Sequence, residues 1–155
     1  MGVALTDDEA WALVAGSLTG IVSTLRADGF PVTLPVWFVA LNRAVYFRTP
    51  ATSKKVARLR RDQRASFLVE AGERWSELTA VSFAAVASEV TDERLRAQVL
   101  EERARKYGDR GPGARRELPS ATVRHYAGES AIIRLTPVGK LITWDNRKIR
   151  RAVRE

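Results

Sequence analysis

The chain has 155 residues, of which 45% are hydrophobic and 28% charged, and this predicts a globular protein with a buried core rather than a disordered segment. It contains no cysteine and one histidine, which excludes thiolate metal sites, cysteine nucleophiles and multi-histidine metal sites. The net charge of +8 indicates an anionic partner, and composition leaves open whether this is nucleic acid, an acidic lipid surface or a small phosphorylated ligand.

The N-terminal residues 1–14 contain acids where a signal peptide needs basic residues. No apolar run approaches the ~20 residues that a membrane span requires. We therefore expect a cytoplasmic protein with no membrane partner.

The first third of the chain predicts one helix followed by a meander of three antiparallel strands. Thr6 and Glu9 have the spacing of a capping box, which starts a helix over residues 7–18. The dipeptide Asp28-Gly29 is a strong hairpin turn signal. Alternating apolar residues predict three strands, over residues 20–27, 30–40 and 44–49.

Two prolines restrict the place of the second strand. Pro31 and Pro35 have no N–H to donate to a sheet ladder, so the strand that contains them must meet an edge, a bulge or a strand end.

The remaining two thirds predict two more helices among further strands. Val56 and Leu59 form the inner face of a short helix over residues 51–62. A longer helix over residues 91–108 has an inner face made of Leu95, Val99 and Leu100. Strands are expected over residues 65–70, 75–90 (as one strand or two), 129–137 and 138–145, with an open loop over residues 108–120.

This order of elements predicts a mainly β fold with α additions, in the form of an antiparallel barrel. We see no repeat and no linker, so we expect a single domain over residues 1–155 that ends in a basic tail, residues 145–155.

No common catalytic motif is evident. His125 follows the polar loop near an expected strand start, and no G-x-S-x-G elbow accompanies it, so we expect a surface or capping histidine. Gly-rich phosphate loops of the GxGxxG and Walker types are absent. The catalytic residues therefore stay unknown, and no metal is expected.

The basic stretch TPATSKKVARLRRDQR, residues 49–64, is the main candidate site. Ser53, Lys54 and Lys55 lie where a short helix opens, and the free N–H groups of a helix start bind anions. Two ammonium groups beside them would complete a phosphate pocket. The same pattern also fits a solvated helix face.

Several segments, taken in order, resemble one superfamily. GIVSTLRADGFPVTLPVWFV, AVYFRT and SKKVARLRRDQRASFLVE are similar to the flavin and deazaflavin oxidoreductases of the split β-barrel superfamily, which includes pyridoxamine phosphate oxidase. The later segments WSELTAVSFAAVASEV and IIRLTPVGKLITWDNRKI resemble an actinobacterial branch that depends on coenzyme F420. The resemblance covers residues 9–150. It implies a six-stranded antiparallel split β-barrel that forms a homodimer, with two cofactor sites in grooves between the subunits.

The resemblance also implies, position by position, which residues hold the cofactor. Ser53, Lys54 and Lys55 match a phosphate clamp, and Arg58 lies one turn further along. The strand whose backbone follows the flavin ring edge is matched by Thr33, Pro35, Val36, Trp37 and Phe38. Thr49 matches a hydroxyl beside the ring, and the C-terminal segment often lent to the neighbouring subunit is matched by Trp144 and Arg147. Trp37 and Trp144 also fit core or dimer-interface aromatics.

The implied chemistry is hydride transfer from reduced coenzyme F420 to a small electron-poor substrate, with FMN as the alternative cofactor. The poly-glutamate tail of F420 suits Arg58, Arg60 and Arg61 better than FMN requires. The segment WDNRKIRR lacks the histidine with which pyridoxamine phosphate oxidases hold their substrate, so that substrate is not expected.

Two rivals stay open. One is a non-catalytic protein that stores or carries the cofactor. The other is a nucleic-acid-binding protein, and the apolar alternation around the aromatic residues of the strands counts against it because stacking platforms must be exposed.

Overall fold

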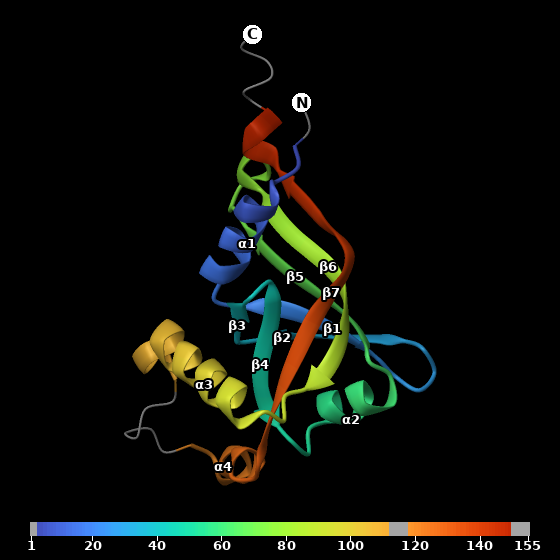
Figure 1. The fold of residues 1–155 in the computed structure, drawn as a ribbon, viewed down its shortest axis with the longest axis vertical. Helices are drawn as coiled ribbons and strands as arrows, with labels where there is room; N and C mark the ends of the chain where they lie inside the picture. Colours follow the sequence, from blue (N-terminus) through green and yellow to red (C-terminus); the bar gives the residue numbers. More distant parts are fainter. Residues whose placement is uncertain (1–2, 112–117, 150–155) are drawn as a thin grey trace.

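In a computed structural model of the chain, the structure describes residues 3–111 and 118–149. The final part of the expected basic tail, residues 150–155, and residues 112–117 of the expected loop lie outside the described residues. Within these ranges, seven strands form one antiparallel sheet that curls on itself, and four helices pack around it (Figure 1). No helix in the described ranges is long and apolar enough to cross a membrane.

The bounds of the elements follow the sequence closely in the first half of the chain. The capping box of Thr6 and Glu9 is formed, with both reciprocal hydrogen bonds present. The elements of this half are α1 (Asp7–Gly16), β1 (Gly20–Leu25), β2 (Pro31–Val36), β3 (Phe38–Leu41), β4 (Ala44–Pro50), α2 (Lys54–Arg61) and β5 (Arg64–Ala71).

The second half contains the two longest strands. Its elements are a 3-10 turn η1 (Trp75–Glu77), β6 (Thr79–Glu89), α3 (Glu93–Tyr107), η2 (Gly108–Arg110), α4 (Ser120–Tyr126), β7 (Ser130–Asp145) and η3 (Asn146–Lys148). The two strands expected over residues 129–145 are one, because a bulge opposite Ser82 and Ala84 lets β7 bend without ending. Gly139 lies in this bulge at φ +73°, a conformation that glycine adopts without strain.

The single strand expected over residues 30–40 is two strands, and this is the main correction to the sequence analysis. The strand order is β2-β1-β5-β6-β7-β4-β3, so β2 and β3 are the two opposite edges of the sheet. Only Trp37 separates them in the chain. The expected meander and the expected count of six strands are therefore wrong, and the prolines of β2 do lie on an edge strand as their missing N–H groups require.

Because its two edges are joined by one residue, the sheet must curl until they meet. The hydroxyl of Tyr107, at the end of α3, lies at this junction: it accepts from the Phe38 N–H at 2.7 Å and approaches the carbonyls of Leu18 and Phe38 at 2.8 Å. One phenol group thus satisfies main-chain groups that no ladder reaches between β2 and β3.

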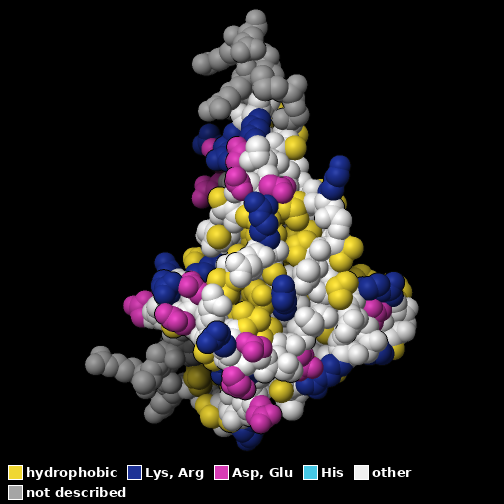
Figure 2. Space-filling model, in the orientation of Figure 1, with side chains coloured by type: hydrophobic (Ala, Val, Ile, Leu, Met, Phe, Trp, Pro, Cys, Tyr) yellow, Lys and Arg dark blue, Asp and Glu magenta, His cyan; other side chains and the backbone are white. Residues whose placement is uncertain are grey.

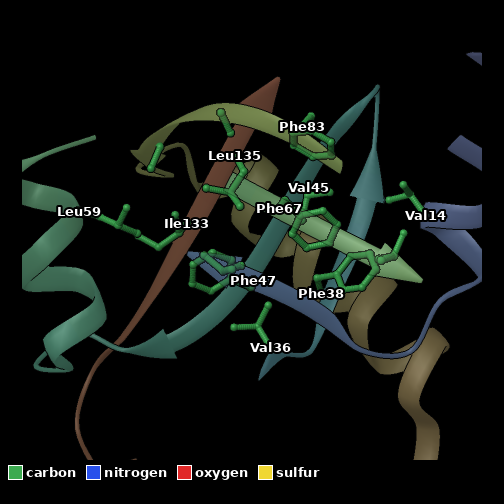
Figure 3. Close-up of a cluster of buried hydrophobic side chains, with 14 of the residues drawn as sticks. Val14, Val36, Phe38, Val45, Phe47, Leu59, Phe67, Phe83, Ile133 and Leu135 are labelled. Carbon is green, nitrogen blue, oxygen red and sulfur yellow. The ribbon is translucent and has the colours of Figure 1, made fainter. Parts of the chain in front are cut away.

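The concave side of the sheet encloses the core. Figure 3 shows Phe38, Phe67, Phe83 and Val45 turned toward one another, with Val14 of α1 entering from one side. Leu59 of α2 enters from the opposite side, beside Ile133 (Figure 3). The rings of Phe38 and Phe67 meet edge to face with centroids 4.9 Å apart, which is a favoured aromatic geometry.

The convex side of β3, β4 and β7 is covered by α3 through a second, smaller apolar cluster. Its buried residues are Val39, Ala44, Tyr46, Val90, Val99 and Ile132. The expected inner face of α3 is only partly right: Leu95 and Val99 pack inward, but Leu100 is 41% exposed. Arg103 and Tyr107 follow Val99 at steps of four and take the inward places instead.

The expected loop over residues 108–120 is followed by a helix that the sequence analysis did not predict, since α4 begins at Ser120. His125 lies on this helix and not at a strand start, and its side chain is exposed. This position fits the expected surface histidine.

Gly20→Ala is expected to destabilise the protein by about 1–3 kcal/mol, because a Cβ at this position of β1 would overlap the buried ring of Phe67. Urea unfolding measures the change. Gly16→Ala, at the end of α1 where a Cβ meets nothing within 4 Å, is the matched control and should leave stability unchanged or slightly higher. Equal stability of both variants would contradict close packing at Gly20.

Candidate cofactor site

The start of α2 brings together a buried hydroxyl, a helix cap and free main-chain donors. The Ser53 Oγ accepts from the Val56 N–H and from the Thr49 Oγ1, both at 3.3 Å. Among the described residues, no acceptor is bonded to the N–H groups of Lys54 and Lys55, as is normal in a first helical turn. These donors are available to an anion.

The ammonium group of Lys55 lies over the ring of Phe47, with Nζ 5.5 Å from the ring centroid. Burial lowers the pKa of Lys55, and the neighbouring charge of Arg58 lowers it further. No carboxylate in the described ranges forms an ion pair with Lys55. A phosphate at this point would favour the charged form and raise the pKa again.

Two arginines of α2 tie the helix to β1. The Arg58 Nε donates to the Thr24 Oγ1 at 2.7 Å, and a terminal nitrogen of Arg61 donates to the Leu25 carbonyl at 2.7 Å. Arg58 is therefore placed beside the candidate clamp, with its remaining donors free for a ligand. Lys54 is exposed.

The other basic residues of this stretch are neutralised. Arg60 binds Glu89 through two hydrogen bonds of 2.8 Å, and Arg64 pairs with Asp62 at 2.8 Å. Such exposed pairs add ~0–1 kcal/mol each to stability, but they cancel charge locally. Arg60 thus offers less to a poly-glutamate tail than its position in the sequence indicates.

The segment predicted to follow the ring edge, residues 33–38, lies partly on the edge strand β2 and partly in the packed junction between β2 and β3. Thr33 and Pro35 are exposed on β2, and the Thr33 hydroxyl shares a 2.7 Å hydrogen bond with Ser23. Val36 ends β2 and is buried. Because β2 pairs only with β1 among the described strands, no strand in this part of the chain bonds its outer main-chain groups.

The two aromatic residues of this segment are engaged by packing. Trp37 stacks on Tyr107 with centroids 4.4 Å apart and planes 6° from parallel. Phe38 is fully buried, and its N–H is bonded to Tyr107. Their side chains are therefore structural within one subunit.

The C-terminal candidates lie far from the others. Trp144 and Arg147 are at the end of β7 near the chain termini, whereas α2 lies at the opposite end of the molecule (Figure 1). Thr49 pairs with Ala131, thirteen residues before Trp144 on the same strand, which corresponds to roughly 40 Å of extended chain. One subunit does not bring the two groups together.

Arg147 is held by its own chain. Two hydrogen bonds of 2.8 Å join it to Asp145, whose carboxylate is buried. The Arg147 guanidinium holds the pKa of Asp145 below its usual range. This pair fixes the direction of the arginine while leaving part of its fork open.

Two hollows in the described surface are lined by none of the predicted cofactor-binding residues. One of about 180 Å³ lies beside α2 and is lined by Val56, Leu59, Arg60, Gln63, Ala87, Ser88, Glu89 and Ile133. The other, of about 440 Å³, lies between α1 and the end of β5 and is lined by Ala12, Leu13, Gly16, Ser17, Leu18, Thr19, Glu70 and Ala71. Neither hollow contains the unbonded N–H groups at the start of α2.

A family model described as pyridoxamine 5'-phosphate oxidase matches residues 6–139. The chain belongs to the pyridoxamine 5'-phosphate oxidase family. This confirms the superfamily that the ordered segments indicate, and no curated protein sequence is significantly similar to the chain.

Solved structures of similar fold include members from several bacteria. A conserved hypothetical protein of Mycobacterium tuberculosis is 28% identical with a TM-score of 0.79, over 96% of this chain and 89% of that one. The haem storage protein HutZ of Vibrio cholerae is 17% identical with a TM-score of 0.69, over 93% and 96%. An FAD-binding protein of Mycobacterium smegmatis is 22% identical with a TM-score of 0.61, over 92% and 98%. The fold therefore occurs with different bound groups.

The sequence analysis did not predict a second group of basic residues, which lies around α3. Arg103 lies over the rings of Trp37 and Tyr107, at 5.7 and 5.6 Å from their centroids. The Lys106 Nζ lies 3.8 Å from the centroid of Phe38 and 5.5 Å from that of Tyr107. The step of four from Val99 to Arg103 was the available signal, but a charged residue at an inward position is usually read as solvated.

Lys106→Met is expected to stabilise the protein at pH 7 by about 0.5–1 kcal/mol, since it removes a half-buried ammonium group that has no acidic partner among the described residues. Burial lowers the pKa of Lys106 to about 8, below its unfolded value of 10.5. Between these values the unfolded chain binds more protons, so wild-type stability rises with pH and the advantage of the variant shrinks.

Urea unfolding between pH 7 and pH 10 measures this difference, with the exposed Lys140→Met as control. A variant that is less stable than wild type at pH 7 would show that the Phe38 ring compensates the buried charge.

Proposed function

We propose that this protein is an oxidoreductase that binds coenzyme F420, with FMN as the alternative cofactor, and reduces a small electron-poor substrate. The observation that supports it most is Lys55: a half-buried ammonium group without an acidic partner among the described residues, beside free N–H groups at the start of α2. Family membership and flavin-binding proteins of the same fold support a flavin-like ligand.

The residues present fit such a cofactor. Lys54, Lys55 and the cap of Ser53 would hold a phosphate, with Thr49 and Arg58 beside it. The unpaired edge of β2, at Thr33 and Pro35, would meet the ring. When bound, the cofactor supplies the hydride chemistry, and the protein contributes position and charge.

The choice of F420 rests on the resemblance of the later segments to the F420-dependent branch. Of the arginines that suit an acidic tail, Arg60 is occupied by Glu89, while Arg58 and Arg61 bind neutral groups of β1. Arg58 and Arg61 are thus left to bind an acidic tail. The proposed phosphate clamp at the start of α2 fits either F420 or FMN.

We further propose that the site is completed by a second subunit. The separation of Trp144 and Arg147 from α2 along β7 supports this, because a ring and phosphate bound at α2 do not extend to the far end of that strand. In a two-fold dimer, the C-terminal segment of one chain would meet α2 of the other.

Lys55→Met is expected to weaken binding of F420 by about tenfold or more, since a charge-assisted phosphate contact contributes about 1.5–3 kcal/mol. Titration of both F420 and FMN into wild type and variant measures the change. Lys140→Met, an exposed lysine of β7, removes the same charge and should bind as wild type does.

Failure of both cofactors to bind wild type below ~100 µM would remove the basis of the proposal. Tight binding without turnover of any reducible acceptor would instead identify a cofactor carrier.

Mixed subunits test the two-chain site. Lys55→Met and Arg147→Met dimers should each bind F420 weakly, but a random 1:1 mixture contains heterodimers in which one of two sites has neither change. About a quarter of all sites should therefore regain wild-type affinity, provided that the subunits pair as a two-fold dimer. A mixture that binds no better than its parents would show that the two residues do not meet across subunits.

A further inference from the structure

A second group of basic residues comes from α3, β4 and β7. We call it the α3 cation cluster, and it consists of Arg48, Arg103, Lys106 and Arg134. No carboxylate of the described residues forms an ion pair with any of the four. By contrast, Arg105 on the outer side of α3 binds both Glu101 and Glu102.

Nitrogen atoms of this cluster are buried without hydrogen bonds. These atoms are the Arg103 Nε, the Lys106 Nζ and the Arg134 Nε. A buried unpaired donor costs about 1–3 kcal/mol, and more when it is charged. Three such donors in α3 and the neighbouring strand β7 leave room for acceptors from outside the chain.

Aromatic rings lie next to the basic groups of the α3 cation cluster. Arg103 and Lys106 lie 5.6 and 5.5 Å from the centroid of the same ring, Tyr107, which itself stacks on Trp37. Arg134 lies 5.8 Å from the centroid of Tyr46. The guanidinium of Arg48 is close enough to lower the pKa of Arg103, after the larger effect of burial. A bound anion would reduce the repulsion between these neighbouring positive charges.

Figure 2 shows apolar side chains gathered in the middle of one face of the molecule, with separate basic side chains among them. Trp37 also adjoins β2, the edge strand to which the proposed cofactor ring is assigned.

We propose that the α3 cation cluster is a second anion site, which binds the carboxylate or phosphate group of the substrate. The identification of the ligand as the substrate rests on the proposed function. The existence of an anion site does not. Arg103 would bind the oxyanion through its planar fork, and Lys106 would add a second charge from the next turn of α3.

The test uses cofactor-free protein and two probes, benzoate and inorganic phosphate. NMR titration follows the indole N–H of Trp37, which the Trp37→Phe variant assigns. We expect a saturable shift with at least one probe, and the probe that saturates identifies carboxylate or phosphate as the bound group. Arg103→Met and Lys106→Met should each weaken it about tenfold, as expected for loss of one charge-assisted contact.

Arg105→Met is the matched control, since it removes the same charge from the same helix on its exposed face, and it should bind within about twofold of wild type. Lys106→Arg retains the charge and should restore most of the affinity that Lys106→Met loses. The titrations with benzoate and phosphate use neither F420 nor FMN. Failure of the cofactor titration would therefore not contradict this anion site.

No saturable shift with either probe into the tens of millimolar would overturn the proposal. So would equal weakening by Arg105→Met, which would show that only the general charge of the helix attracts the anion. If Arg103→Met instead weakens subunit association in gel filtration and no probe binds, the missing acceptor belongs to a second copy of the chain and the proposal is wrong.

Discussion

The junction at Trp37 is the constraint on which the structure depends. One residue connects the two edge strands β2 and β3, so the seven strands can satisfy their pairing only as a curled sheet with a filled interior. The Tyr107 hydroxyl completes the junction, because it binds the Phe38 N–H where the ladder is interrupted. Through this bond α3 is fixed against β3. The curl then places the start of α2 beside β1, and the convex face of β4 under α3.

Charge is distributed in two ways on this frame. Basic residues on outer faces form ion pairs, such as Arg60 with Glu89 and Arg105 with Glu102, and these pairs contribute little beyond local neutrality. Lys55 and Lys106 are both half-buried and unpaired, and burial lowers the pKa of each. Stability alone does not favour such groups, because each desolvated ammonium opposes folding. The net charge of +8 is thus less informative than the two half-buried ammonium groups that have no ion-pair partner among the described residues.

The length of β7 decides how a binding site can be assembled. Its sixteen residues run from the neighbourhood of Thr49 to the chain termini, so residues at its two ends serve different places on one subunit. Asp145 orients Arg147 at the far end. The proposed two-fold dimer would bring the far end of one strand to α2 of the other chain. The fold is shared with haem and FAD-binding proteins, so the ligand depends on such local details rather than on the sheet.

The sequence by itself determined the local features: the capping box of Thr6, the hairpin at Gly29, the inner residues Val56 and Leu59 of α2, and the ordered segments that identify the family. These signals depend on neighbours in the chain, so spacing and residue type are enough to reveal them. Only the tertiary structure decided that residues 30–40 divide at Trp37, because both halves have the same strand pattern and pairing partners lie far away in the sequence. It also decided that Arg103 and Lys106 turn inward. Their surroundings come from β3 and β4, and a helical pattern does not show whether an adjoining face provides acids, aromatic rings or water.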